Sequence, residues 1–479
     1  MRRVAQTASD DQTLTNGVPT PDHPPGYRLR RGRNWVFLGL TYASYYLCRY
    51  NLSPVAPELK HDLGFNNSQY GMINSGRDGA YAVGQMINGL FTDRVGGKQA
   101  MTIGAIATII LNLLFGAATW SSAGLSMMVF TLVAIRSIDG YMQAFGAPGM
   151  VKINAAWFRR RERGAFAGIF GFMINIGTWG AGQLGKSLIL GLSIPLLFTT
   201  IHFRALNWRY IFIIPPFIVA VIIILMNLLV KNTPEEAGFH IKHDEEPTGE
   251  TDEHIGLMDV FRKIASNRTV WIVAFAYFCT GFVRRGVETW WAVYLDDTWN
   301  AGKGSGLYTA FVWGLPITAS FGSLLSGYIS DKLFNSRRAP VAAIMYIIQA
   351  GLTLIALLIP HHGDTTRAAV AVCLVIGISM MCNSTHSILG TAAPMDLGGR
   401  KMTGCSFGII DSFQYYGALL SGYGLGALFD YLGGASKAAG HGHLSPYAWF
   451  GSMLPFGLLG AGLMTYLWIR HGKSGVAGT

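Results

Sequence analysis

The sequence predicts an all-α membrane protein with twelve spanning helices, arranged as two pseudo-symmetric six-helix bundles. Of its 479 residues, 51% are hydrophobic and only 13% are charged, too little polar surface to cover a soluble globule of this size. Apolar runs such as residues 211–230 and 341–359 recur along the chain and are long enough to cross a hydrocarbon core of about 30 Å. Polar landmarks repeat once over the two halves of the chain, as set out below.

The elements follow in order along the chain. Residues 1–33 are polar, rich in arginine and proline, and lack the apolar core of a signal peptide, so we expect a disordered cytoplasmic tail. The N-terminal bundle is expected over 34–230, a hydrophilic cytoplasmic linker over 231–268, the C-terminal bundle over 269–472 and a short cytoplasmic tail over 473–479. The predicted spans are 34–57, 69–92, 98–119, 125–151, 164–190, 207–230, 269–295, 305–330, 339–360, 368–392, 402–429 and 446–470.

Basic residues indicate how the spans are oriented. Lysine and arginine number 37 against 26 acidic residues, and most of them fall in the tails and in alternate loops on one side. The loops of the other side carry few: Lys60, Arg204, Arg209, Lys303, Arg367 and Lys437. Because cytoplasmic loops are enriched in basic residues, we expect an inner-membrane protein with both termini in the cytoplasm. The positive charge is then explained by the orientation of the spans, and we expect no nucleic-acid partner.

The internal repeat concerns charged and small residues at matching places. Arg49 in the first span matches Arg284 in the seventh, Asp93 and Arg94 after the second match Asp331 and Lys332 after the eighth, and Gly164 matches Gly404. The offsets lie between 235 and 240 residues. Such a repeat is expected of two bundles related by an axis normal to the membrane, with a cargo site between them at the midplane.

Two arginines within spans are the main candidates for cargo binding. A guanidinium inside a bilayer costs at least about 2.5 kcal/mol unless it faces a cavity or a partner. Arg49 and Arg284, paired by the repeat, would face each other across a central cavity and together neutralise a dianion such as phosphate. The alternative is that each arginine pairs separately with a structural carboxylate.

Residues 89–98, including Gly89, Asp93 and Arg94, resemble the signature loop of the major facilitator superfamily, with a weaker copy at 327–338 that contains Asp331. The resemblance implies the major facilitator fold and a gating role for these residues. The string 42–51, residues 282–286 and the linker start at 232–238 are similar to motifs of the organophosphate:inorganic phosphate antiporters, which carry glycerol-3-phosphate and hexose phosphates. By that likeness the substrate-binding residues would be Arg49, Arg284, Tyr42, Tyr46, Tyr81, Gln85, Asn175 and Tyr415.

The chain departs from the family pattern at two positions. Gln85 replaces a lysine of the glycerol-3-phosphate carriers, and Ile174 replaces a histidine. Further intramembrane charges either neutralise one another or form a rearranged cavity; these residues are Arg77, Asp78, Arg136, Asp139, Arg285 and Glu288. His386 and Asp411 are either cargo contacts or proton carriers, or polar contacts between helices.

The sequence shows no nucleotide-binding loop, nucleophile or metal-ligand cluster, so we expect neither an enzyme nor a cofactor or metal. The five cysteines are expected to be packing residues. The predicted function is exchange of a small organic anion, a phosphate ester, for inorganic phosphate by a monomer. Two alternatives remain: a proton- or sodium-coupled symporter of sugar acids, which the strings 81–85 and 51–53 also resemble, and a transporter-like sensor of sugar phosphate.

Overall fold

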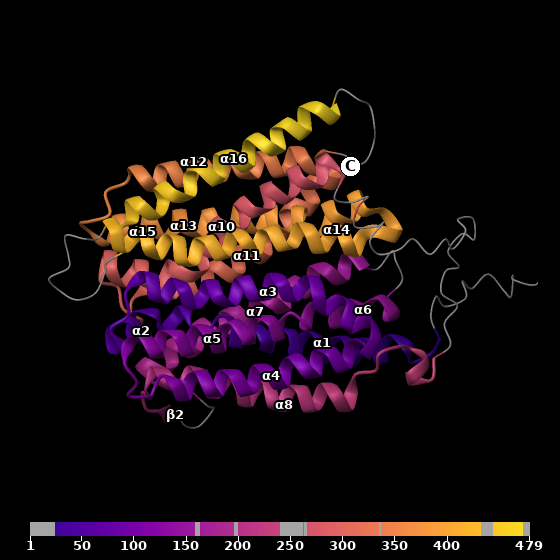
Figure 1. The fold of residues 1–479 in the computed structure, drawn as a ribbon, viewed down its shortest axis with the longest axis horizontal. Helices are drawn as coiled ribbons and strands as arrows, with labels where there is room; N and C mark the ends of the chain where they lie inside the picture. Colours follow the sequence, from indigo (N-terminus) through magenta and orange to yellow (C-terminus); the bar gives the residue numbers. More distant parts are fainter. Residues whose placement is uncertain are drawn as a thin grey trace, which may run out of the picture.

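The computed structural model describes residues 24–158, 163–195, 200–239, 262, 266–334, 337–432 and 444–472. Its helices run roughly parallel along the long axis of the molecule, with the N-terminal half on one side and the C-terminal half on the other (Figure 1). The first half contains α1 (Tyr27–Arg49), η1 (Ser53–Val55), α2 (Ala56–Leu63), α3 (Asn67–Val95), α4 (Gly97–Ala118), α5 (Leu125–Gln143), α6 (Gly146–Trp157), α7 (Arg163–Leu190), η3 (Trp208–Phe212) and α8 (Ile214–Leu229).

The short turn η4 (Glu235–Ala237) follows, at the start of the linker. The second half contains α10 (Arg268–Trp299), α11 (Gly306–Leu333), α12 (Arg338–Leu358), α13 (Thr365–Ser387), η5 (Ile388–Ala392), α14 (Ala393–Leu419), η6 (Leu420–Gly424), α15 (Leu425–Leu432) and α16 (Pro446–Gly472). Each predicted span coincides with one helix or with consecutive helices, so the twelve-helix fold is confirmed.

Eight helices in the described part of the chain are long and apolar enough to cross a membrane by length and hydropathy alone. Others, such as α1 and α3, carry more polar residues, among them Arg49, Arg77 and Asp78. Asp78 of α3, and Tyr50 directly after α1, contact the other half, so this part of their surface faces protein and not lipid.

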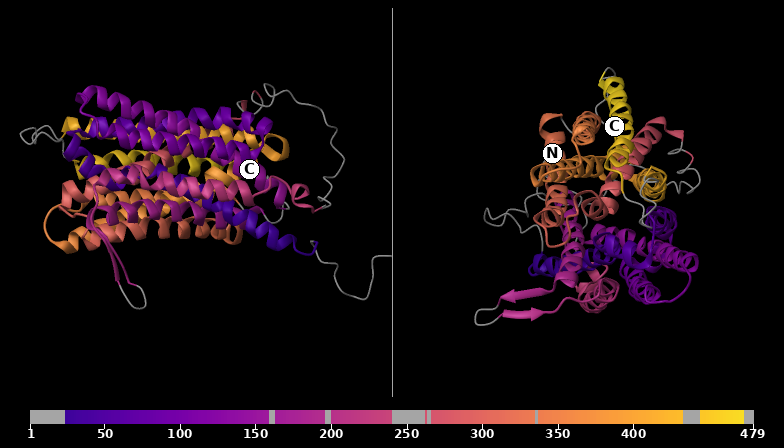
Figure 2. Two further views of the ribbon diagram at one scale, coloured as in Figure 1. Left: turned by 90° about the horizontal axis from the view of Figure 1, so that it is seen from below. Right: turned by 90° about the vertical axis from the view of Figure 1, so that its left-hand side faces the viewer.

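The halves are joined mainly by α3, which packs on α14 and α15, and by α7, which packs on α11. We call the end of the molecule that carries α2 and α15 the outer end; the described chain begins and ends at the opposite end (Figure 1). Between α7 and α8 the strands β1 (Leu192–Pro195) and β2 (Thr200–Phe203) form an antiparallel hairpin that projects from the bundle near the outer end (Figure 2). The sequence predicts only a loop there.

The first helix differs from expectation at both ends. It begins at Tyr27, inside the segment predicted to be a disordered tail, because Tyr27 is buried and its hydroxyl donates to the carbonyl of Trp157 at 2.6 Å. It ends at Arg49, inside the predicted span 34–57, where the chain turns into η1. Residues 1–23 of the predicted tail, most of the linker and the C-terminal tail lie outside the described residues.

Candidate functional site

Arg49 is the last residue of α1 and is almost fully buried at the centre of the bundle. Its guanidinium carbon lies 4.6 Å from the ring centre of Tyr46 and 4.4 Å from that of Tyr81. Its Nε donates to Oε1 of Gln143 at 2.8 Å, but its buried Nη2 has no hydrogen-bond partner within the described structure. Since a buried unpaired N–H costs free energy, this nitrogen is suited to an anionic ligand.

Two further arginines hold the end of α1 in place. The last carbonyl groups of a helix have no partner within it. The carbonyl of Arg49 accepts from Nη1 of Arg77 at 2.8 Å and from Nη2 of Arg136 at 2.9 Å. Each of the two also contacts a carboxylate on its own helix: Nη2 of Arg77 lies 2.8 Å from Asp78, and Nη1 of Arg136 lies 3.3 Å from Asp139. Arg77 and Arg136 therefore position Arg49 and are themselves neutralised.

Arg284 lies in the middle of α10 and has more partners than Arg49. Its Nε lies 3.1 Å from Oδ1 of Asn383 and 3.1 Å from Oε1 of Glu288. Its Nη1 donates to the side-chain oxygen of Gln414 at 3.0 Å, in the amide orientation in which the Gln414 nitrogen donates to Asp411. For Arg284 this contact with Glu288 matches the alternative considered from the sequence, in which the arginine pairs with a carboxylate.

A chain of alternating charges joins the two halves beside Arg284. The Oε2 atom of Glu288 accepts from Nη1 of Arg285 at 3.0 Å and from the hydroxyl of Tyr50 at 2.9 Å. Arg285 Nε lies 3.2 Å from Oδ2 of Asp78, which belongs to α3 in the other half. The Arg285–Glu288 contact has the i,i+3 spacing considered from the sequence, and the bridge to Asp78 and Tyr50 adds an interaction between the halves.

A cavity of about 50 Å³ opens at Arg284. Glu288, Asn175 and Asn383 also line it, and Asn175 Nδ2 donates across the halves to Ser320 Oγ at 2.7 Å. Arg49 is not among the described residues that line this cavity. Tyr46 lies between the two arginines: it contacts Arg49 on one side and stacks on Tyr50, which lines the cavity, at 5.5 Å. The structure thus brings the two arginines to the centre but does not open one shared cavity between them.

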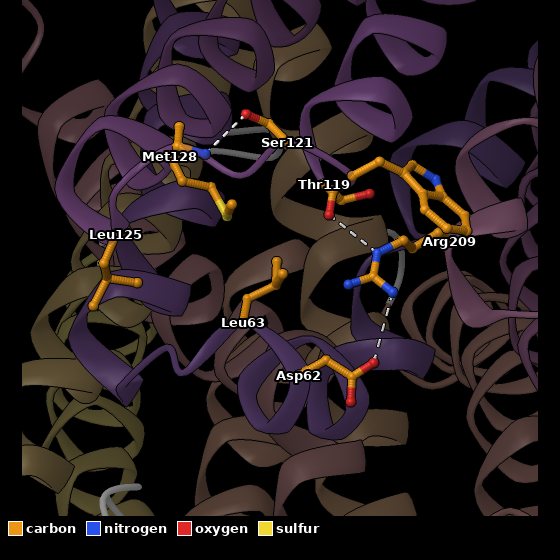
Figure 3. Close-up of a pocket in the computed structure, with 9 residues that line it drawn as sticks. Asp62, Leu63, Thr119, Ser121, Leu125, Met128 and Arg209 are labelled. Atoms are coloured by element: carbon orange, nitrogen blue, oxygen red, sulfur yellow. Dashed lines mark hydrogen bonds and ion pairs between the residues drawn. The ribbon is translucent and has the colours of Figure 1, made fainter.

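A larger hollow of about 390 Å³ lies at the outer end, away from these arginines (Figure 3). Its one arginine, Arg209, donates to the carbonyl of Thr119 at 3.1 Å, lies 3.7 Å from Asp62 and stacks on Trp208. Because this guanidinium is already paired, the hollow is a weaker candidate for anion binding than the centre.

The other candidates from the sequence lie at the following places. Tyr42 packs against Tyr46, and Tyr81 packs against Tyr415 at 4.5 Å and accepts from Gln85 Nε2 at 3.0 Å. His386 bonds the hydroxyl of Tyr277 at 2.6 Å, and Asp411 accepts from the Gln414 amide at 3.3 Å. Gly89 and the exposed Arg94 lie in α3, far along the helix from Arg77; the side chains of Asp93 and Asp331 lie outside the described part.

Three contacts of the site came from residues that the sequence analysis did not select. Gln143, Asn383 and Gln414 each bond one of the two arginines from another helix. Each is an amide side chain within a predicted span, and this feature could have identified them. The chain has many such amides, however, and the arginines that they contact are distant in sequence. Within the described residues, no group of three His, Cys, Asp or Glu side chains could hold a metal ion.

Comparison with known proteins bears on the family and the fold of the chain. Residues 38–422 match the sequence profile of the Major Facilitator Superfamily. The chain is 28% identical over 405 residues to the glycerol-3-phosphate transporter of Bacillus subtilis, covering 81% of this chain and 84% of the relative. It is 27% identical to the hexose-6-phosphate:phosphate antiporter of Escherichia coli, covering 82% of each, and 25% identical to the membrane sensor protein UhpC of the same species, covering 84% and 87%.

Among solved structures, the fold is similar to that of a bacterial homolog of the human lysosomal transporter Spinster, with a TM-score of 0.68. The match covers 92% of this chain and 95% of that one, at 17% sequence identity. The predicted fold and the resemblance to the organophosphate:phosphate antiporters are confirmed.

Proposed function

The chain belongs to the major facilitator superfamily, and on this premise we propose that it exchanges a phosphate ester, such as glycerol-3-phosphate or a sugar phosphate, for inorganic phosphate. The two halves would rock about the central site and expose it to each side of the membrane in turn. Relatives named as a glycerol-3-phosphate transporter and as a hexose-6-phosphate:phosphate antiporter support this cargo class.

The observation that carries the proposal is the unsatisfied Nη2 of Arg49, which is buried and separated from Arg284 by the Tyr46 ring. A phosphate oxygen would satisfy it, and the neighbouring Tyr46 ring would have to move for the same phosphate to reach Arg284. Because Arg49 lies next to an amide and not a carboxylate, its charge is uncompensated when the site is empty. Return of an empty carrier is therefore costly, and this favours exchange over uniport.

The orientation belongs to the same proposal. The excess of basic residues in the tails and alternate loops supports an inner-membrane protein with both termini in the cytoplasm, so that the outer end faces away from the cytoplasm. We take a monomer to be the working unit, because the central site is built from the two halves of one chain.

Counterflow of labelled phosphate in proteoliposomes tests the function. The wild type should exchange phosphate, and Arg49→Lys and Arg284→Lys should each abolish exchange, since an ammonium cannot reproduce the planar fork. Arg209→Lys at the outer end is the matched control and should retain exchange. Phosphate exchange that persists in Arg49→Lys or Arg284→Lys would count against the assignment.

A sensor is the second candidate, because the chain is also similar to a membrane sensor protein over most of its length. A sensor would bind phosphate or its ester without counterflow, so binding measured by thermal shift together with absent exchange would favour it. Uptake that depends on a proton or sodium gradient would instead favour a symporter.

A further inference from the structure

We infer that Ser75 of α3 is a positioning residue for closure of the outer end. Its hydroxyl holds a widened turn of the opposite half, and this turn closes to regular α-helix when the halves separate there. The inference rests on the proposed function only in requiring that the two halves move apart at the outer end. It follows from two hydrogen bonds of Ser75 and from the winding of η6.

The widened turn is η6, which lies between α14 and α15 and is wound as π-helix over the 5 residues Leu420–Gly424. In an α-helix each backbone N–H donates to the carbonyl four residues earlier, so the N–H of Tyr423 would donate to Leu419. A π-helical turn holds more residues than an α-helical one. Single turns of this kind are rare and occur frequently at functional sites.

Ser75 lies where the bond between Tyr423 and Leu419 would form. The N–H of Tyr423 donates to Oγ of Ser75 at 2.7 Å, and the Ser75 hydroxyl donates to the carbonyl of Leu419 at 2.6 Å. One hydroxyl of the first half therefore lies between a donor and an acceptor of the second half that pair directly in an α-helix. Ser75 is 6% exposed, so these polar groups depend on each other and not on water.

The surroundings of η6 fit this insertion. A Cβ on Gly422, in the middle of the turn, would lie 3.2 Å from the backbone nitrogen of Ser75 and would collide with its Oγ. The carbonyl of Ser421 accepts from the indole of Trp290 at 3.1 Å, a contact within the second half. The turn is thus held from both sides, and separation of the halves removes only the contact with Ser75.

The Ser75 contact lies on α3 between the cargo site and the outer end. One helical turn away, Asp78 contacts Arg285 of the other half at 3.2 Å. Toward the outer end, the first N–H groups of α3 donate to Asp430, which belongs to α15 directly after η6. Closing η6 to α-helix turns α15 about its axis, because an α-helical turn holds fewer residues, and so moves Asp430 away from α3. Release of Ser75 and release of Asp430 are therefore coupled.

Hydrogen exchange of single backbone amides in the purified protein, without cargo, tests this inference. Ser75→Ala removes two hydrogen bonds between the halves, which corresponds to an open population about 5- to 150-fold larger. The amides of Asn67 and Ser68, which donate to Asp430, should exchange faster by about that factor. The amide of Tyr423 should stay as protected as in the wild type, because it then donates to Leu419.

Ser326→Ala is the matched control. Ser326 is also a buried serine within a helix, but its hydroxyl donates to the carbonyl of Ser323 in the same helix, α11. The three amides should exchange in this variant as they do in the wild type. Since alanine is the residue most compatible with a helix, both variants should fold.

Three results would overturn the inference. Faster exchange of the Tyr423 amide in Ser75→Ala would show that the turn does not close to α-helix. Unchanged exchange of the Asn67 and Ser68 amides would show that Ser75 does not hold the outer end closed, and equal acceleration in Ser326→Ala would indicate general loosening. Failure of the proposed function is distinguishable, since wild-type phosphate counterflow would then be absent whatever these exchange rates are.

Discussion

At the scale of single residues, the five buried arginines have different roles that only their partners reveal. Arg77 and Arg136 direct their guanidiniums at the backbone carbonyl of Arg49, and so fix the end of α1. Arg284 and Arg285 share the carboxylate of Glu288. Arg49 alone of the five is held chiefly by aromatic rings and an amide, which orient its guanidinium without neutralising it.

Replacing Tyr81 tests this aromatic support. Tyr81→Leu removes one of the two rings on Arg49, and a cation–π contact of about 0.5–2 kcal/mol corresponds to a KM for phosphate about 2- to 30-fold higher. Tyr81→Phe keeps the ring and loses only the hydroxyl that accepts from Gln85, so its KM should stay near the wild-type value. Equal KM values in the two variants, measured by phosphate exchange, would refute the role of the ring.

The sequence predicted part of this site. Arg49 and Arg284 stood out because each is an arginine inside a span and because a repeat pairs them, and both lie at the centre. The Arg284–Glu288 contact has i,i+4 spacing and could have been considered, but Glu288 was paired only with Arg285. Tyr50, Gln143 and Gln414 were missed because contacts between helices depend on helix packing, which no sequence period encodes.

At the scale of helices, closely packed glycines bring α3 against the second half. A Cβ on Gly71 would lie 2.2 Å from the backbone oxygen of Gly422, and a Cβ on Gly426 would lie 2.3 Å from that of Asn67. Neither neighbour can move like a flexible side chain, because both are backbone atoms. The outer part of α3 can therefore pack against η6 and α15 only when these two residues are glycines.

Gly71→Ala should hinder closure of the outer end and slow phosphate exchange. Overpacking of about 1–3 kcal/mol would shift the closed population by about 5- to 150-fold. Gly351→Ala, in α12, is the matched control, since a Cβ there meets no atom within 4 Å and exchange should be unchanged. An unchanged exchange rate in Gly71→Ala would mean that this contact is not part of the transport cycle.

The connection between α12 and α13 gives a pH-dependent contribution to stability. The ring of His361 is buried there, stacked on Phe450 and hydrogen-bonded to the Ala356 carbonyl and the Tyr294 hydroxyl. Burial lowers the pKa of His361 below its usual value of 6.5. The unfolded chain therefore binds a proton more readily than the folded protein, so stability falls as the pH drops below 6.5.

His361→Phe should reduce this acid sensitivity. The fall in Tm between pH 7 and pH 5, measured in detergent, should be smaller in the variant than in the wild type, because the ring stays and the titrating nitrogen is lost. His362→Phe serves as the control: the His362 side chain is exposed and makes only the smallest contribution to the lowered pKa of His361, so the slope should stay close to that of the wild type. Identical slopes for all three proteins would contradict the assignment.

At the scale of the whole molecule, composition and apolar runs were enough to predict the twelve-helix fold, because lipid requires long continuous helices. The details that failed depend on local partners. The helical start at Tyr27 requires its contact with Trp157, and the hairpin of β1 and β2 follows from pairing between short segments. The relation between the halves, which decides which end is closed, likewise depends on contacts far apart in the chain.

Several of those contacts close the outer end. Lys303 forms an ion pair with Glu58, Lys60 Nζ lies 3.4 Å from Asp297, and Asp430 accepts from the first backbone N–H groups of α3 at 2.7 and 3.1 Å. Each joins one half to the other. Alternating access requires that these contacts break when the outer end opens, so their strength should set how often it does.

Exchange of the two charges of the Glu58–Lys303 pair tests this requirement. Lys303→Glu places two carboxylates together, and Glu58→Lys places two ammonium groups together. Like charges in a partly buried contact cost several kcal/mol. Either single variant should therefore favour the open outer end and slow phosphate exchange. The double variant restores opposite charges and should recover most of the phosphate exchange rate, giving a coupling energy in a double-mutant cycle. A double variant as slow as the sum of the two single effects would show that the pair does not hold the halves together. Recovery would show that closure of the outer end depends on the charges themselves and not on the identity of the residues that carry them.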